Sequence, residues 1–437
     1  MIDSSSQAAR PIVRRHAAGE SAREVEERPL SVVEAEVVRA TLALTGLRPT
    51  NFGFMRVGMR LDGCLDRAAL ERAAHTLGER HDIWRTSFHV RDDQAYARLD
   101  PVVPTVFRFV ECATQQAVET VIASEIAAGF TLSEAPLHRW LLVRLSEHVH
   151  IFYHFAHHSI FDGFAHSLLF RELGALYDAH HAGTTPKLPS VLQYSDVAIA
   201  EEASLTPAVR AAHQAFWSRH LLEGAPRRPL ASMAERPAGQ RLFRAERYRT
   251  DLACGLGLVA YCKARGRDLH VVLLASLAAM LEAEGAGATP IAHLSTNRRR
   301  ETMRVLGNFT KYLPLRIPVE RSDSFDVVAD RTHAILEACA PYHDLPPPFE
   351  PTKGVLPYRL FFNCYKQSPW LKLDGVEVTV LGVFEKTHVV FDLELNFVLD
   401  LDGAVRLMVY YNAELITQPQ LLDFLGRYEQ YLRSAID

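Results

Sequence analysis

Three histidines and an aspartate lie within ten residues of this chain, in the stretch HFAHHSIFDG at 154–163. Histidine is the side chain whose ordinary pKa, about 6.5, suits proton transfer at neutral pH. An imidazole can also bind a metal ion or lie hydrogen-bonded in a core. The stretch therefore presents three alternatives: an acid–base site, a metal site, or a set of structural histidines.

The run that precedes the aspartate, VHIFYHFAHH, predicts a β-strand, in which successive side chains point to opposite faces. His154 and His158 then share one face, and His157 lies on the other. Because His157 and His158 point apart, one metal ion bound by both is disfavoured. His154 and His158 share that face, but no third metal ligand is obvious nearby. The pattern favours acid–base chemistry over a metal, and leaves catalytic and structural histidine evenly matched.

Asp162 and Gly163 lie in the predicted turn between this strand and a helix. A carboxylate at that position can cap the helix, or it can pair with an arginine and fix the loop that aims the histidine.

The composition excludes several classes of protein. The 437 residues carry a net charge of −4, which argues against a nucleic-acid binder. No apolar run reaches the roughly 18–20 residues of a membrane span, and the N-terminus has no secretory signal, so a cytoplasmic location is expected. The six cysteines are scattered, which indicates free thiols rather than disulfides or a zinc site.

Strand-like and helical patterns alternate in both halves of the chain, which predicts two α/β lobes. Residues 1–28 read as a flexible N-terminal tail, because they are polar and carry few large apolar groups. We predict an N-terminal lobe over 29–183 and a C-terminal lobe over 190–437, separated by the Pro/Gly-punctuated segment GTTPKLPS.

Five motifs together resemble the condensation domains of nonribosomal peptide synthetases, within the chloramphenicol acetyltransferase-like superfamily. HHSIFDG fits the family's HHxxxDG signature, and RHDIWRTSF at 80–88 is similar to RHExLRTxF. QYSDVAI at 193–199 resembles YxDFAxW, VLGNFTKYLPLR at 305–316 resembles GxFVNTxPLR, and YHDLPPPFE at 342–350 resembles HxDLPFE. The resemblance runs from about residue 29 to the end, which leads us to expect a free-standing enzyme.

The resemblance implies two acetyltransferase-like lobes arranged in a V as a pseudo-dimer, with a central tunnel that contains His158 as the catalytic residue. His157, Asp162 and Gly163 would support the site structurally, and Asp162 would pair with Arg80 or Arg85. The donor would be an acyl thioester on the phosphopantetheine arm of a carrier protein. The acceptor would be a small amine or alcohol, free or carrier-bound. No bound cofactor, no metal and a monomer are expected.

Further residues are candidates for lining the tunnel, namely His154, Phe164, Asn308, Lys311 and Tyr312. Phe164 stands where the family often has Trp, and Lys311–Tyr312 replace its usual Asn–Thr. Phe164 keeps an aromatic side chain at its position. If Lys311 and Tyr312 line the acceptor side of the tunnel, they would alter which acceptor is used, and an acceptor that is not bound to a carrier is then expected. The arginines of STNRRR at 295–300 either floor the tunnel or form a solvated face, and the sequence leaves both open. Alternatives to the condensation enzyme are a CoA-dependent acyltransferase of the same fold and a non-catalytic recruitment module.

Overall fold

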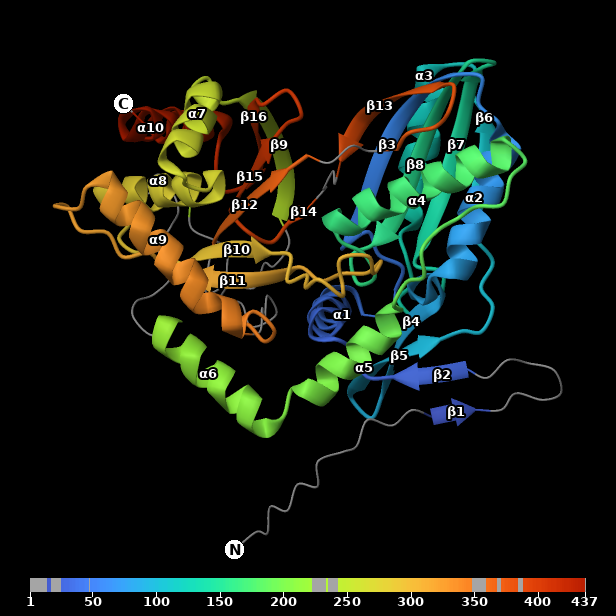
Figure 1. The fold of residues 1–437 in the computed structure, drawn as a ribbon, viewed down its shortest axis with the longest axis horizontal. Coiled ribbons are helices and arrows are strands. Elements are labelled where there is room, and N and C mark those ends of the chain that lie inside the picture. The colour runs from blue at the N-terminus through green and yellow to red at the C-terminus, as the bar shows by residue number, and fades with distance from the viewer. Residues whose placement is uncertain are drawn as a thin grey trace, which may run out of the picture. The chain divides into compact units, whose positions relative to one another are not determined.

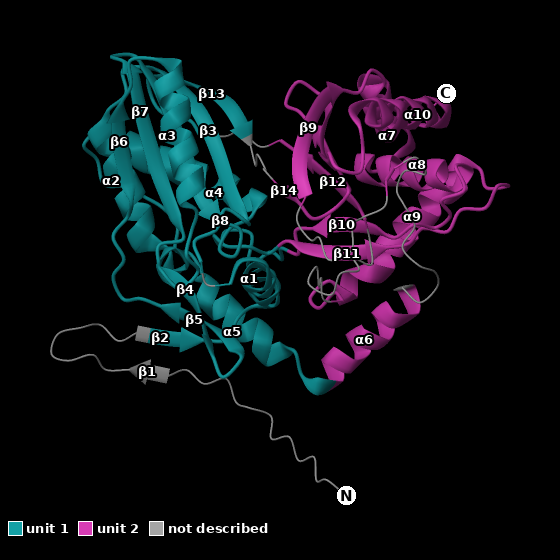
Figure 2. Ribbon diagram, turned by 180° about the vertical axis from the view of Figure 1, so that it is seen from behind, with its two compact units in different colours: residues 1–207, 298–309, 369–385 teal, residues 208–297, 310–368, 386–437 magenta. Residues whose placement is uncertain are grey.

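The chain folds into two compact units, which are coloured separately in Figure 2. The computed structural model describes residues 14–16, 25–46, 48–221, 233–234, 243–347, 359–367, 371–383 and 388–436. Unit 1 comprises residues 1–207, 298–309 and 369–385, and unit 2 comprises residues 208–297, 310–368 and 386–437. Each unit has its own sheet and its own apolar core, as the prediction of two α/β lobes required.

Unit 1 is built on a five-stranded sheet with the strand order β13-β3-β8-β7-β6 (Figure 1). Its strands are β3 (Phe54–Gly63), β6 (Phe107–Glu111), β7 (His138–Ser146), β8 (Val149–His157) and β13 (Val376–Val383). Only the β6–β7 pair is parallel. β3 and β8 pack tightly, because a Cβ atom on Gly58 would lie 2.4 Å from the Tyr153 ring.

A smaller antiparallel sheet of unit 1 has the order β1-β2-β5-β4. Its strands are β1 (Arg14–His16), β2 (Val25–Arg28), β4 (Thr86–Arg91) and β5 (Gln94–Leu99). Arg28 is buried and forms an ion pair of 2.7 Å with Glu34. The predicted flexible tail of residues 1–28 therefore extends too far along the chain, because Val25–Arg28 form a strand of unit 1. The rest of that tail, apart from 14–16, lies outside the described residues.

Six helices lie in the described part of unit 1, and a side chain caps the first turn of four of them, α1 to α4. They are α1 (Val32–Thr45), α2 (Arg67–Arg80), the short 3₁₀-helix η1 (Asp82–Arg85), α3 (Gln115–Ala128), α4 (Gly163–His181) and α5 (Tyr194–Ser204). Ser31 caps α1 in a capping box with Glu34, and Asp162 caps α4. α2 and α4 pack against each other on one face of the five-stranded sheet (Figure 1).

Unit 2 has a seven-stranded sheet with the order β11-β10-β12-β15-β16-β9-β14. Its strands are β9 (Phe243–Asp251), β10 (Ile291–Ser295), β11 (Lys311–Leu315), β12 (Leu360–Lys366), β14 (His388–Val389), β15 (Leu393–Leu399) and β16 (Val405–Asn412). Its helices are α6 (Pro207–Leu221), α7 (Gly255–Arg265), α8 (Leu269–Ala283), α9 (Phe325–Cys339), the 3₁₀-helix η2 (Ala340–Tyr342) and α10 (Gln418–Ile436). Alternate residues Leu393, Leu395 and Phe397 enter its main core, as strand periodicity requires.

The units are not consecutive in sequence. Residues 298–309 lie between β10 and β11 in the chain, yet they belong to unit 1, and so does the β13 segment 369–385. The predicted boundary at 183–190 therefore differs from the structure, which keeps α5 in unit 1 and returns to unit 1 twice. Among the described helices, none is both long and apolar enough to cross a membrane.

Candidate active site

His158 follows the last residue of β8, where its backbone N–H donates to the Gly53 carbonyl at 2.7 Å. Its ring atom Nδ1 lies 2.7 Å from the carbonyl oxygen of Phe161. A carbonyl oxygen only accepts, so Nδ1 carries the hydrogen of this bond. In the neutral ring the lone pair then resides on Nε2. His158 is partly exposed, in contrast to the fully buried His157 beside it. This arrangement gives His158 the tautomer that a general base needs.

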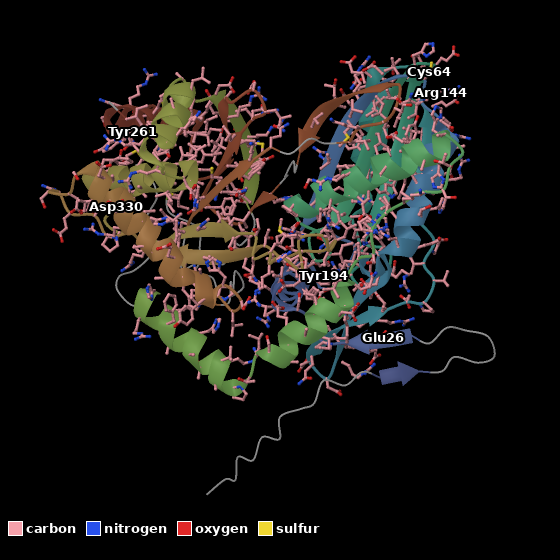
Figure 3. All side chains as sticks on the ribbon, in the orientation of Figure 1. Glu26, Cys64, Arg144, Tyr194, Tyr261 and Asp330 are labelled. Atoms are coloured by element: carbon pink, nitrogen blue, oxygen red, sulfur yellow. The ribbon has the colours of Figure 1, made fainter. Side chains whose placement is uncertain are left out.

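Asn308 holds the backbone of His158. Its amide Nδ2 donates to the His158 carbonyl oxygen at 2.6 Å and lies 3.3 Å from the ring atom Nδ1. The Asn308 carbonyl in turn accepts from the hydroxyl of Tyr194, the first residue of α5, at 2.7 Å (Tyr194 is labelled in Figure 3). A Cβ atom on the neighbouring Gly307 would lie 2.0 Å from the Tyr194 ring, so only glycine allows this approach. The sequence predicted Asn308 only as a tunnel-lining residue and did not predict its hydrogen bond to the His158 backbone.

Asp162 is fully buried and ties three parts of unit 1 together. One oxygen caps α4 by accepting from the Ala165 N–H at 2.7 Å, and the other accepts from the Phe309 N–H at 2.9 Å. The guanidinium of Arg298 donates to both oxygens at 3.1 and 3.2 Å. Gly163, between Asp162 and the rest of the helix, is the first residue of α4. The turn after β8 is therefore fixed through one carboxylate.

The prediction that Asp162 pairs with Arg80 or Arg85 is wrong. Arg80 pairs with Glu172 of α4 at 3.0 Å, and Arg85 donates to the backbone carbonyls of residues 100 and 101. The partner is Arg298, one of the arginines of STNRRR whose role the sequence left open. A buried arginine 136 residues away carries no local signal that distinguishes it from its exposed neighbours.

Arg298 makes several contacts besides the ion pair with Asp162. Its side chain is 1% exposed and also donates to the backbone carbonyls of Thr302, Val305 and Gly307. Its guanidinium lies over two rings, 4.7 Å from the Phe164 centroid and 4.3 Å from the Phe309 centroid. Phe164, predicted as a lining residue, thus packs against the arginine that fixes Asp162.

His157 supports the site from the core. Its Nδ1 accepts from the Ser159 N–H at 3.1 Å and lies 2.8 Å from the Ser159 hydroxyl. Burial lowers the pKa of His157 to about 3, so its ring is neutral at physiological pH. Gly53, with φ +70°, brings the backbone against this ring. His157 is a packed, hydrogen-bonded residue rather than a second acid–base group.

His154 does not line a cavity, and that prediction is wrong. Its side chain is fully buried in the core of unit 1, and its Nδ1 lies 3.2 Å from Nε2 of His166. The rings of Trp84, Trp140 and Phe161 surround it at centroid distances of 5.7, 4.2 and 5.4 Å. Burial lowers the pKa of His154 well below its ordinary value. The strand is covered on both faces, so sharing a face with His158 does not bring His154 to an opening.

Lys311 and Tyr312 belong to unit 2, where they begin β11. Lys311 is buried and its Nζ donates to the Asp344 carbonyl at 2.6 Å. Tyr312 packs edge-on against Phe361 and Phe391. Their predicted part in choosing the acceptor stays a prediction. Within the described ranges, no three histidine, cysteine or acidic side chains are grouped so that they could hold a metal ion.

The sequence matches the family model of the condensation domain over residues 48–437. It is 27% identical over 394 residues to malpibaldin synthetase from Mortierella alpina, an alignment that covers 86% of this chain and 7% of the synthetase. It is 26% identical over 401 residues to surfactin synthase subunit 1 from Bacillus subtilis, covering 87% of this chain and 10% of that subunit. The chain thus spans a tenth or less of the length of these relatives.

Solved structures match over almost the whole chain. The X-domain from teicoplanin biosynthesis superimposes with a TM-score of 0.78 at 23% identity, covering 93% of this chain and 94% of that one. The starter condensation domain of rhizomide synthetase gives 0.74 at 15% identity, with 93% and 95% coverage. The SgcC5 protein from Streptomyces globisporus gives 0.73 at 19% identity, with 93% and 98% coverage. These matches confirm the predicted acetyltransferase-like fold, and together with the family model they show that the chain belongs to the condensation-domain family of nonribosomal peptide synthesis.

Proposed function

We propose that this protein transfers an acyl group from the phosphopantetheine thioester of a carrier protein to an amine or alcohol, with His158 as the general base. The observation that carries the proposal is the hydrogen bond from His158 Nδ1 to the Phe161 carbonyl. It fixes the tautomer whose Nε2 can take a proton, and Asn308 holds the residue in place from the other side.

The reaction follows from that tautomer. The acceptor oxygen or nitrogen attacks the thioester carbonyl while Nε2 of His158 removes its proton, and a tetrahedral intermediate forms. The intermediate collapses with cleavage of the carbon–sulfur bond. The imidazolium returns the proton to the departing thiolate, so that His158 is neutral again. An alcohol must lose its proton as it attacks, whereas a free amine attacks unaided, so the base matters more for an alcohol.

We further propose that the acceptor is a free small-molecule alcohol. Two observations favour it. Lys311 and Tyr312 replace the family's usual Asn–Thr. The similar SgcC5 protein was solved with (R)-(-)-1-(2-naphthyl)-1,2-ethanediol, a diol that is not attached to a carrier.

The test offers acyl-loaded carrier protein and acyl-CoA to the wild type with a panel of amines and alcohols. His158→Ala is expected to lower kcat for an alcohol by about 10²- to 10⁴-fold, and to affect an amine less. The control is His75→Ala, which removes an exposed histidine of α2. Wild-type rates in folded His158→Ala would refute the catalytic role. Transfer from CoA alone would favour the CoA-dependent alternative, and a folded wild type without any transfer would favour a recruitment module.

A further inference from the structure

Residues 298–309 present two different sides. On their buried side, Arg298 forms an ion pair with Asp162, and Asn308 donates a hydrogen bond to the His158 carbonyl. These two contacts fix the candidate active site. The exposed side of the segment consists of residues that take no part in those contacts: Arg299, Arg300, Glu301, Met303 and Arg304. We call this exposed surface the basic turn.

The basic turn differs in charge from the rest of the protein. The whole chain has a net charge of −4, yet the six residues RRETMR at 299–304 carry three arginines and one glutamate. Met303 stands among these cations with 41% of its surface exposed. Arginine and methionine are enriched at protein interfaces, where cations attract an anionic partner and an apolar side chain is desolvated.

Hydrogen bonds from the Thr302 and Arg298 side chains, together with one backbone bond, hold the backbone of the basic turn. The Thr302 hydroxyl accepts from the Arg299 N–H at 2.9 Å and donates to the Arg299 carbonyl at 3.1 Å. The Thr302 carbonyl accepts from the Arg298 guanidinium at 3.0 Å and from the Val305 N–H at 3.1 Å. A partner would therefore bind a surface that is already ordered, and little entropy would be lost on binding.

The basic turn also lies within reach of the reaction. Arg304 is four residues from Asn308, so their Cα atoms are at most about 14 Å apart. Asn308 contacts His158 directly. A partner held at Arg304 would therefore lie on the same short segment as the residue that contacts His158.

We propose that the basic turn docks the acyl-donating carrier protein through its acidic surface and the phosphodiester at the root of its arm. The inference rests on the proposed function and adds the surface that receives the donor. Charge complementarity favours a carrier protein as the partner that binds the basic turn. The phosphodiester and the acidic side chains are both anionic, and arginine binds phosphate and carboxylate in the same forked geometry.

The experiment measures, by fluorescence anisotropy, the dissociation constants of labelled, phosphopantetheinylated carrier proteins of nonribosomal peptide synthetases. Arg300→Glu/Arg304→Glu is compared with Arg48→Glu/Arg321→Glu, which makes the same charge change at two exposed arginines elsewhere. The first pair is expected to weaken binding about tenfold, equivalent to about 1.4 kcal/mol. The control pair should bind as the wild type does, and added salt should reduce the difference.

Transfer kinetics separate this inference from the proposed function. The basic-turn variant should raise KM for the carrier-bound donor about tenfold, with little effect on an acyl-pantetheine thioester that lacks a protein surface. Equal dissociation constants in the two double variants, or no binding by the wild type, would overturn the docking proposal. If the wild type transfers from neither donor, the proposed function fails, while the comparison of dissociation constants still decides the docking surface.

Discussion

Replacing Arg298 by Met tests how the site is held together. The change removes the guanidinium that donates to both oxygens of Asp162, and leaves that carboxylate buried with only the N–H groups of Ala165 and Phe309. It also removes the donor of three backbone carbonyls. Breaking one partner of a buried ion pair costs about 3–5 kcal/mol, a large part of the roughly 5–15 kcal/mol that stabilises a folded protein.

The assay is urea denaturation of four proteins: the wild type, Arg298→Met, Asp162→Asn/Arg298→Met, and the exposed control Arg300→Met. We expect Arg298→Met to lose about 3–5 kcal/mol of unfolding free energy and the control to change by less than about 0.5 kcal/mol. The double variant should recover part of the loss, because no uncompensated charge remains buried. A loss below about 1 kcal/mol in Arg298→Met, or a double variant at least as unstable as the single one, would refute the reasoning.

Three further predictions concern the surroundings of the site. Burial lowers the pKa of three histidines of unit 1 to about 3, namely His138, His157 and His166. Below the ordinary pKa of about 6.5 the unfolded chain binds protons that the folded chain does not, so stability should fall by about 4 kcal/mol between pH 7.5 and pH 5.5. Urea denaturation at the two pH values measures this fall, and equal stabilities would contradict it. Gly307→Ala should cost about 1–3 kcal/mol in the same assay because its Cβ would collide with Tyr194. Unchanged stability there would show that the ring moves aside. Asn308→Ala should lower kcat about tenfold with little change in KM, since it loosens His158 without removing it. Steady-state kinetics with the panel of acceptors decide this, and an altered KM alone would point to a lining role instead.

The sequence singled out His158 and Asp162 as candidates because the signature that contains them is local in the chain. It failed for the partner of Asp162, since Arg298 reaches the carboxylate from a segment of the chain far away, and residue type alone cannot separate it from the exposed Arg300. It failed for His154 for another reason. Alternation along one strand tells which residues share a face, but not whether another element covers that face.

The early start of the fold was missed because Val25–Arg28 is short and charged, which is typical of a solvated segment. Its order comes from pairing with β5 and from the buried Arg28–Glu34 pair, both of which involve residues further along the chain. The two-lobe α/β class was predictable from periodicity, because each strand and helix carries its own pattern. The return of two later segments to unit 1 has no such local pattern.

That return has a practical consequence for recombining lobes between relatives. A cut near residue 207 would separate unit 1 from Arg298 and Asn308, which hold the turn that carries His158 and Asp162. A chimera that takes residues 1–207 from one parent must therefore also take residues 298–309 and 369–385 from that parent, because all three segments form unit 1. A single crossover that exchanged whole lobes would separate His158 and Asp162 from residues 298–309, so inheritance of the candidate site requires two distant stretches of the gene to travel together.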